Sequence, residues 1–258
     1  AHNLCVRVFC DCLMWEMENA EVQVGAESAN ILEEDEAPML SSHALAALKE
    51  FLAERDKRLV EADVEQVPPD EDGIEQLSLV PEDWGLSQFW YDSETAGTIA
   101  KEVILLARNA DSSCRVACIA CPTLYPYIKK LDSSVPVQLL EYDQRFEKYG
   151  ADFTFYDYNQ PEQLPVHLRH SFGVVVADPP YLSRECLEKV SQTISLLSSS
   201  KTASVLLLTG HVQKEKAEEL LALHPCGFRP QHSSKLGNEF RLFTNYDPGE
   251  RLGGWKVD

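Results

Sequence analysis

The chain has 258 residues, of which 44% are hydrophobic, so it can bury a core for one large domain or two small ones. Its net charge of −19 is uneven: residues 1–83 carry 21 acidic and 5 basic side chains, a net of −16, and residues 84–258 carry 21 and 18, a net of −3. The nearly neutral part argues against tight binding to duplex nucleic acid, which draws on clustered Lys and Arg. The opening residues contain no apolar stretch resembling a signal peptide or membrane span, so no membrane contact is expected.

Three segments precede the predicted globular domain. We expect residues 1–40 to be a disordered extension. Leucine and phenylalanine residues at helical spacing predict one amphipathic helix over residues 41–60, and the acids and prolines of residues 61–82 predict a linker. The globular domain is predicted over residues 83–258.

Neither cysteines nor histidines predict a metal site. The spacing of Cys5, Cys10 and Cys12 matches none of the usual zinc patterns. His167 and His170 lie three residues apart without acids or cysteines at ligand spacing, which is typical of surface histidines. The remaining cysteines stand in apolar context without a secretion signal and are interpreted as reduced core residues of a cytoplasmic or nuclear protein, with the cytoplasm as the expected compartment. They are Cys114, Cys118, Cys121, Cys186 and Cys226.

Strand and helix patterns alternate from residue 84 onward, which predicts a parallel α/β sheet. Five strands are predicted over residues 115–120, 137–142, 153–156, 172–177 and 204–209. Helices are predicted over residues 93–107, 122–131, 185–197 and 215–223. A last pair of strands, over residues 228–231 and 239–246, predicts an antiparallel hairpin that turns through residues 235–238.

The stretch V-V-V-A-D-P-P-Y-L-S over residues 174–183 is the most informative part of the sequence. Its apolar start predicts a strand buried on both faces, which must end at Asp178 because Pro179 and Pro180 lack backbone N–H groups. In open α/β sheets, ligands bind at the carboxyl ends of strands. The Asp178 carboxylate and the Pro179 carbonyl are two acceptors that can hold an –NH2 group, and Tyr181 can flank an amine, a planar base or a sulfonium cation. This loop therefore favours chemistry on an amino nitrogen.

Acidic residues also end the second and third predicted strands. Glu141 ends the second strand and suits bidentate hydrogen bonding to ribose hydroxyls. Asp157 follows the third strand and suits the exocyclic amine of an adenine. A single acid at a strand end is commonly a cap for the next helix, but three in succession, with Asp178 last, indicate one site.

Three consecutive aromatic residues, Phe89, Trp90 and Tyr91, precede the helix that Ser93 can cap. They cannot all face one core, so we expect at least one to line a surface or pocket; a hydrophobic clamp at the domain edge is the alternative. His211 follows the fifth predicted strand and is a candidate for substrate contact at the pocket edge.

Together these features resemble the seven-strand class of S-adenosylmethionine-dependent methyltransferases that act on amino groups. More narrowly, residues 40–247 resemble the eukaryotic elongation factor 1-alpha lysine methyltransferases, a family first named for adenine-N6 methylation of DNA. The matching stretches are L-S-S-H-A-L-A-A-L, S-Q-F-W-Y, E-Y-D-Q-R-F, F-Y-D-Y-N, V-A-D-P-P-Y-L-S and N-E-F-R-L-F-T-N-Y-D. The resemblance implies a Rossmann-like α/β sheet of seven strands with a reversed C-terminal hairpin.

The resemblance also implies the cofactor, the substrate and the site. The cofactor is S-adenosylmethionine, and the partner is elongation factor 1-alpha, methylated on a lysine without a metal or a covalent enzyme intermediate. The catalytic candidates are Asp178, Pro179, Pro180 and Tyr181. The cofactor-binding candidates are Glu141, Asp157, Ala120, Cys121, Phe89, Trp90 and Tyr91.

One departure concerns the loop after the first strand, where methyltransferases of this class usually have a glycine-rich segment. Here the sequence is A-C-P-T-L-Y over residues 120–125, without glycine. We still expect Ala120 and Cys121 to border the cofactor.

Two alternatives stay open at this point. Adenine-N6 methylation of DNA or RNA would use the same tetrad, with aromatic neighbours suited to base flipping. A binding module that keeps the fold without catalysis is disfavoured because the strand-end acids and the tetrad are intact. The acidic N-terminal third suits a basic protein partner rather than nucleic acid, and we expect a monomer.

Overall fold

The computed structural model describes residues 79–110, 113–200, 202–234 and 239–256. The predicted extension, the predicted helix over residues 41–60, most of the predicted linker, and Cys5, Cys10 and Cys12 lie outside these residues. Within them, the helices are α3 (Ser93–Ala110), α4 (Leu124–Leu131), α5 (Arg184–Leu197) and α6 (Lys214–Leu221). The strands are β1 (Val116–Ile119), β2 (Val137–Glu141), β3 (Phe153–Phe155), β4 (Val174–Ala177), β5 (Ser204–Gly210), β6 (His224–Pro225) and β7 (Phe240–Thr244).

The strands form one seven-stranded sheet in the order β3-β2-β1-β4-β5-β7-β6. Strands β1 to β5 pair in parallel, and β7 runs antiparallel to both of its neighbours. The order reverses between β1 and β4, and ligands of open α/β sheets bind at the carboxyl ends of the strands at such a reversal. The expected seven-strand α/β sheet with a reversed C-terminal strand pair is confirmed.

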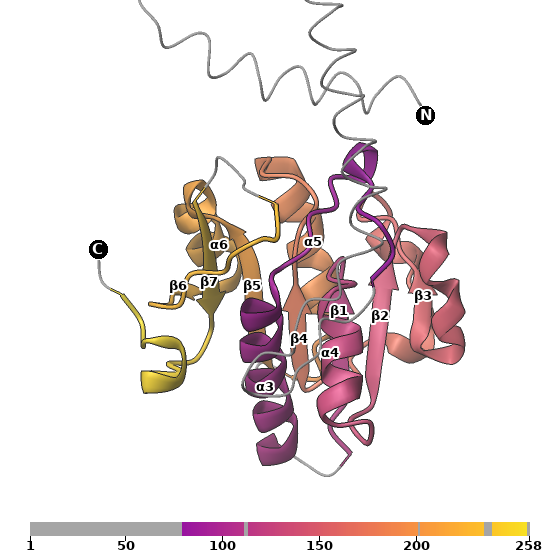
Figure 1. The fold of residues 1–258 in the computed structure, drawn as a ribbon, viewed down its shortest axis with the longest axis horizontal. Coiled ribbons are helices and arrows are strands. Elements are labelled where there is room, and N and C mark those ends of the chain that lie inside the picture. Colours follow the sequence, from indigo (N-terminus) through magenta and orange to yellow (C-terminus); the bar gives the residue numbers. More distant parts are fainter. Residues whose placement is uncertain (1–78, 111–112, 201, 235–238, 257–258) are drawn as a thin grey trace, which may run out of the picture. The chain divides into compact units, whose positions relative to one another are not determined.

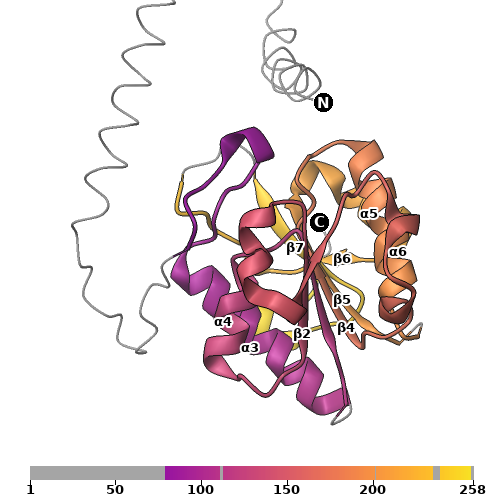
Figure 2. The same cartoon turned by 90° about the vertical axis from the view of Figure 1, so that its right-hand side faces the viewer.

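Successive side chains of each strand point to opposite faces of the sheet, so the core has two layers. In β1, Val116 and Cys118 pack with α3 and α4, whereas Ala117 and Ile119 pack with α5 and α6. Figure 2 shows these two helix pairs on opposite faces of the sheet. All four residues of β1 and all four of β4 are buried, as expected for parallel strands covered on both faces.

The C-terminal strand pair differs in part from the prediction. Strand β7 lies within the predicted range of residues 239–246, but its partner is the two-residue β6, and residues 228–231 are not in a strand. Cys226 forms an antiparallel bridge with Trp255, and the Gly227 N–H then donates to Gly254 O at 2.9 Å. A Cβ on Gly227 would lie 2.7 Å from Gly253 O, so glycine is required for this close approach. The strand prediction over residues 228–231 is therefore wrong.

The start of α3 also differs in detail. The helix begins at Ser93, but the side chain that caps it is Asp92, whose Oδ1 accepts the Thr95 N–H at 2.8 Å. Ser183 caps α5 in the same way by accepting the Cys186 N–H at 3.1 Å. Ser183 is the last residue of the V-V-V-A-D-P-P-Y-L-S stretch, so this cap fixes the point at which the D-P-P-Y loop enters α5.

The segment before α3 crosses the carboxyl edge of the parallel strands (Figure 1). The carboxylate of Glu82 holds this segment in place through two hydrogen bonds. Glu82 Oε1 accepts the Trp90 N–H at 2.8 Å, and Oε2 accepts from Ser234 Oγ at 3.1 Å. The five cysteines among the described residues are free and buried, which confirms that they are core residues. Within the described ranges, no helix is both long and apolar enough to cross a membrane.

Candidate active site

The candidate site lies at the carboxyl edge of the sheet, where β1, β2 and β4 end. In β1, Ile119 is in register with Leu140 of β2. The next residues are held at the same level, because Ala120 N–H donates to Leu140 O at 2.8 Å and Asp178 N–H donates to Ile119 O at 3.0 Å. Glu141, the last residue of β2, therefore lies at the same edge as Asp178.

Asp178 is a carboxyl with an unusually high proton affinity. Its side chain keeps some surface open to solvent, yet the surrounding atoms exclude enough water to raise its pKa from 3.8 to about 7. The Tyr91 hydroxyl donates to Oδ2 at 2.7 Å and lowers the pKa, whereas the charge of Glu141 raises it. Among the described residues, Oδ1 accepts no hydrogen bond, so one carboxyl oxygen is available to a ligand.

The rest of the tetrad forms the wall beside Asp178. Pro179 is buried, and Pro180 and Tyr181 are half-buried. The Tyr181 ring meets that of Tyr158 edge to face, with their centroids 5.9 Å apart. The loop then enters α5 through its serine cap, so its start at β4 and its end at α5 are both fixed.

Glu141 is a second carboxylate at this edge, and one of its two oxygens accepts hydrogen bonds from the backbone. Only 6% of its surface is exposed, and Oε1 accepts the backbone N–H groups of Tyr142 at 2.9 Å and Asp143 at 3.1 Å. Burial raises its pKa to about 7, which the two backbone hydrogen bonds partly oppose. In the part of the chain that the structure describes, Oε2 accepts no hydrogen bond. A buried acceptor at the end of the second parallel strand fits paired ribose hydroxyls.

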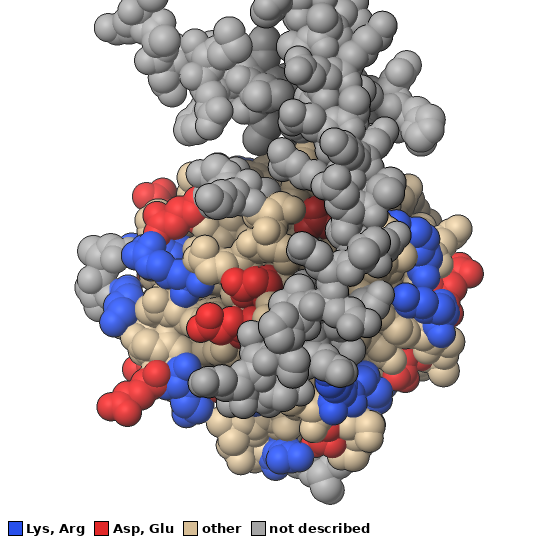
Figure 3. All heavy atoms as spheres, in the orientation of Figure 1, with Lys and Arg blue, Asp and Glu red and all other residues tan. Residues whose placement is uncertain are grey.

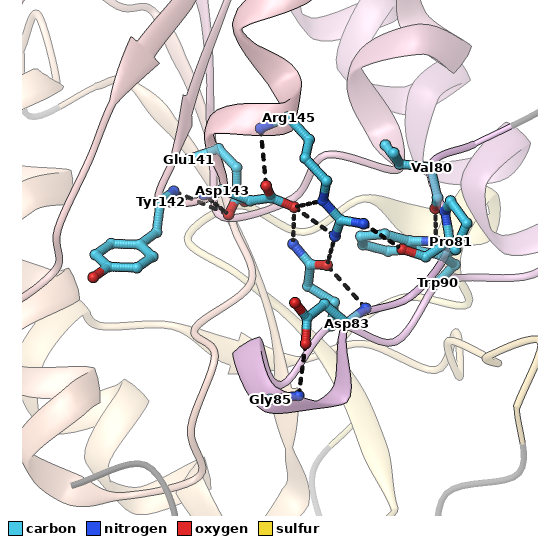
Figure 4. Close-up of polar contacts among 10 residues, drawn as sticks. Val80, Pro81, Asp83, Gly85, Trp90, Glu141, Tyr142, Asp143 and Arg145 are labelled. Carbon is cyan, nitrogen blue, oxygen red and sulfur yellow. Dashed lines mark hydrogen bonds and ion pairs between the residues drawn. The ribbon is translucent and has the colours of Figure 1, made fainter. Parts of the chain in front are cut away.

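An exposed aromatic pair lies next to Glu141. Tyr142 is 51% exposed and Phe155, which ends β3, is 49% exposed; their ring centroids are 5.4 Å apart. In Figure 4, the Tyr142 ring points away from the polar network around Asp143. Sequence reasoning did not single out either residue, although both occur in the stretches E-Y-D-Q-R-F and F-Y-D-Y-N. Their rings form an exposed apolar surface beside Glu141.

Asp157 lies beyond the end of β3 and shapes a turn there. Its Oδ1 accepts the Asn159 N–H at 2.8 Å, and its Oδ2 accepts from Gln160 Nε2 at 3.2 Å. These contacts are those of a capping acid, and its role toward an adenine amine stays a prediction.

The loop after β1 contains no glycine, and an alanine takes the left-handed backbone conformation there. Ala120 has a φ of +51°, in the left-handed region that glycine normally occupies. For alanine this conformation costs about 1 kcal/mol. Cys121 is buried, its Sγ lies 3.7 Å from Val176 O, and burial raises the pKa of the thiol well above its ordinary value, so the thiol stays protonated. Both residues lie at the same edge as Glu141 and Asp178.

The three consecutive aromatic residues separate into three environments. Phe89 is half-buried and meets Trp84 with ring centroids 6.2 Å apart. Trp90 donates from Nε1 to Val80 O at 2.7 Å and packs edge to face on Phe146. Tyr91 is buried and is the one of the three with a recorded contact to Asp178.

Comparison with known proteins identifies the family to which the chain is similar. A family described as probable N6-adenine methyltransferase matches residues 82–248. EEF1A lysine methyltransferase 1 from Homo sapiens is 44% identical over 224 residues, which cover 86% of this chain and 98% of the human protein. A protein-lysine N-methyltransferase from Caenorhabditis elegans is 37% identical over 82% of this chain and 95% of its own length.

The chain belongs to this family of protein-lysine methyltransferases. The resemblance found in the sequence and the expected enzyme class are thereby confirmed. Among solved structures, a S-adenosylmethionine-dependent methyltransferase from Anabaena variabilis is similar, with a TM-score of 0.46 and 12% identity over 61% of this chain and 87% of that one. That likeness is too distant to carry an argument.

A polar clamp fastens the segment before α3 to the turn that follows β2. Arg145 donates from Nε to Asp143 Oδ2 and from Nη2 to Gln88 Oε1, both at 2.8 Å, and from Nη1 to Pro81 O at 3.1 Å. Gln88 in turn donates from Nε2 to Asp143 Oδ2 at 2.9 Å. Figure 4 shows the Arg145 guanidinium between Asp143 and the segment that holds Val80 and Pro81. The clamp links the stretches S-Q-F-W-Y and E-Y-D-Q-R-F.

Removing the cation of this clamp is expected to destabilise the methyltransferase. Arg145→Met leaves Asp143, with a side chain only 5% exposed, without its ion pair. We expect the free energy of unfolding to fall by about 1–3 kcal/mol, since the guanidinium itself is partly solvated. Urea denaturation measures this change. The matched control is Arg184→Met, which removes a solvent-exposed ion pair with Glu188; an equal loss in both variants would contradict a special role for the clamp.

Among the described residues, no histidine forms a hydrogen bond or an ion pair with Asp178 or Glu141. His167 and His170 are exposed, as expected of surface histidines. His211 is half-buried directly after β5, and its Nδ1 is buried without a hydrogen-bond partner among the described residues. Its contact with a substrate stays a prediction.

Proposed function

We propose that this methyltransferase uses S-adenosylmethionine to methylate a lysine side chain of elongation factor 1-alpha. The observation that carries the proposal is the placement of Asp178 and Glu141 at one edge of the sheet, each with one carboxyl oxygen that accepts no hydrogen bond from the described residues. The relatives named EEF1A lysine methyltransferase 1 cover most of both chains, which supports the same substrate here.

The residues present fit the cofactor. The buried Glu141 carboxylate would accept from ribose hydroxyls, and the exposed rings of Tyr142 and Phe155 would cover the base. Ala120 and Cys121 would border the remainder, at the end of β1. When bound, the cofactor supplies a methyl group on a positively charged sulfur.

Asp178 and the Pro179 carbonyl would hold the lysine nitrogen by its hydrogens, so that its lone pair points at the methyl group. A lysine ammonium has a reference pKa of about 10.4 and is not a nucleophile, so a proton must leave first. The apolar wall of Pro180 and Tyr181 favours the neutral amine, because burial disfavours charge. The rate gain would come from alignment and exclusion of water.

The surface charge supports a protein substrate. Lys and Arg are interspersed with Asp and Glu over the visible part of the face in Figure 3, without the continuous basic strip typical of nucleic-acid grooves. Residues 84–258 together carry a net charge of −3.

Transfer of radiolabelled methyl from S-adenosylmethionine tests the proposal. Purified elongation factor 1-alpha, DNA and RNA are offered in parallel to the full chain. We expect label on a lysine of the factor, located by mass spectrometry, and none on nucleic acid. Label on adenine alone would mean that the amine-binding loop is correctly assigned and the substrate wrongly assigned.

A further inference from the structure

Tyr91 is held rigidly at the end of the segment before α3. Its backbone pairs with His232 in an antiparallel bridge, and the two rings lie with centroids 4.6 Å apart. His232 is itself backed by Phe240, again at 4.6 Å. Only 3% of Tyr91 is exposed. The hydroxyl therefore has a fixed position, and it donates to Asp178 Oδ2 at 2.7 Å.

The groups that face Asp178 come from three elements, and none of those recorded is a cation. Glu141 at the end of β2 is an acid, and Cys121 after β1 is a buried protonated thiol. Burial, and then the charge of Asp178, raises the pKa of Tyr91 well above 10, so its hydroxyl keeps its proton. His232, behind Tyr91, has a pKa lowered by burial to about 4 and is neutral near pH 7. Among the described residues, the Tyr91 hydroxyl is thus the side-chain donor to this carboxyl.

We propose that Tyr91 is a positioning residue for methyl transfer, which fixes Asp178 through Oδ2 and leaves Oδ1 as the oxygen that receives the substrate amine. This inference rests on the proposed function. It gives Tyr91 a role different from the cofactor contact expected from the sequence. Without the hydroxyl, the carboxyl group can rotate about its last bond, and neither oxygen is held in one position for the substrate amine.

The hydroxyl also sets the proton affinity of the carboxyl. A hydrogen bond donated to an ionised carboxylate stabilises the charged form and lowers its pKa. Burial and the charge of Glu141 oppose this effect and raise the pKa of Asp178 to about 7. Loss of the hydroxyl therefore raises the pKa of Asp178 further, so a larger fraction of the enzyme carries a protonated Asp178 at neutral pH.

Tyr91→Phe tests the proposal because it keeps the buried ring and removes only the hydroxyl. We expect kcat on the pH-independent plateau to fall about five- to tenfold, with the Kd for S-adenosylmethionine unchanged. The acidic limb of the kcat profile is expected to move upward by about half to one pH unit. The matched control is Tyr246→Phe, which removes a similar hydroxyl bond of 3.1 Å to the carboxyl of Glu102, between two residues that the site does not include; it should leave the profile unchanged.

A second measurement needs no substrate and separates this inference from the proposed function. The carboxyl carbon of Asp178, assigned with the Asp178→Asn variant, is titrated by NMR in wild type and in Tyr91→Phe. An upward shift in the variant supports the inference even if elongation factor 1-alpha is not the substrate. The inference is overturned by equal titration curves, by an unaltered plateau kcat in an active enzyme, or by a weakened Kd for the cofactor.

Discussion

We expect Asp178→Ala to reduce methyl transfer by at least about 10²-fold, with cofactor affinity within about threefold of wild type. The variant removes the acceptor at Oδ1 that would hold the amine, but it leaves Glu141 and the loop after β1 in place. Single-turnover transfer of labelled methyl measures the chemical step, and calorimetric titration with S-adenosylmethionine measures binding. Glu250→Gln, which changes an exposed acid, is the control.

The amide variant separates the acceptor from its charge. Asp178→Asn keeps an oxygen that can face the amine, while its NH2 group can donate to the Tyr91 hydroxyl. We expect a smaller loss than in the alanine variant, and we expect the acidic limb near pH 7 to disappear because the titrating group is gone. Wild-type activity in Asp178→Ala would refute the assignment.

Stability measurements distinguish a catalytic loss from a folding defect. A carboxyl whose folded pKa is about 7, against an ordinary 3.8, binds its proton more tightly in the native state than in the unfolded state. Its contribution to stability is present below about pH 4 and is lost as the pH rises to 7. Asp178→Asn should therefore be no less stable than wild type at pH 8. A variant that loses both folding and cofactor binding would show that Asp178 is structural.

The sheet and its acids could be predicted because local patterns determine them. Runs such as V-V-V-A are buried on both faces, so their ends fall at one edge of a parallel sheet. That rule predicts that Glu141 and Asp178 lie at the same edge, as they do in the structure. The prediction was wrong at residues 228–231, because the two-residue β6 is too short to leave a pattern and the next residue, Cys226, pairs with the distant Trp255.

The contacts that complete the site could not be predicted, because they join distant parts of the chain. The Tyr91 and Asp178 side chains are 87 positions apart, and nothing in the order F-W-Y says which ring turns inward. Arg145 reaches Gln88 across 57 positions. The left-handed conformation of Ala120 could not be predicted either, because the residue that usually indicates this conformation in a sequence is glycine.

Glu141→Gln is expected to weaken binding of S-adenosylmethionine by about tenfold, and Glu141→Ala by about 10²-fold. Glutamine can keep an oxygen at the backbone N–H groups of Tyr142 and Asp143, but it places an NH2 group where the ribose hydroxyls need an acceptor. Alanine removes both functions. Calorimetric titration measures these dissociation constants, and Glu147→Gln, an exposed acid nearby, is the control.

The pH dependence gives this assignment a sharper test than affinity alone. Burial raises the pKa of Glu141 from 4.5 to about 7, and only the ionised carboxylate accepts from two hydroxyls without first losing a proton. Wild-type affinity should therefore increase as the pH rises from 6 to 8, and Glu141→Gln should show no such increase. An unchanged dissociation constant in both variants would remove Glu141 from the cofactor site. If Glu141→Ala lowered the affinity for S-adenosylmethionine and Glu141→Gln kept the wild-type affinity, Glu141 would act through its hydrogen bonds to the backbone of Tyr142 and Asp143.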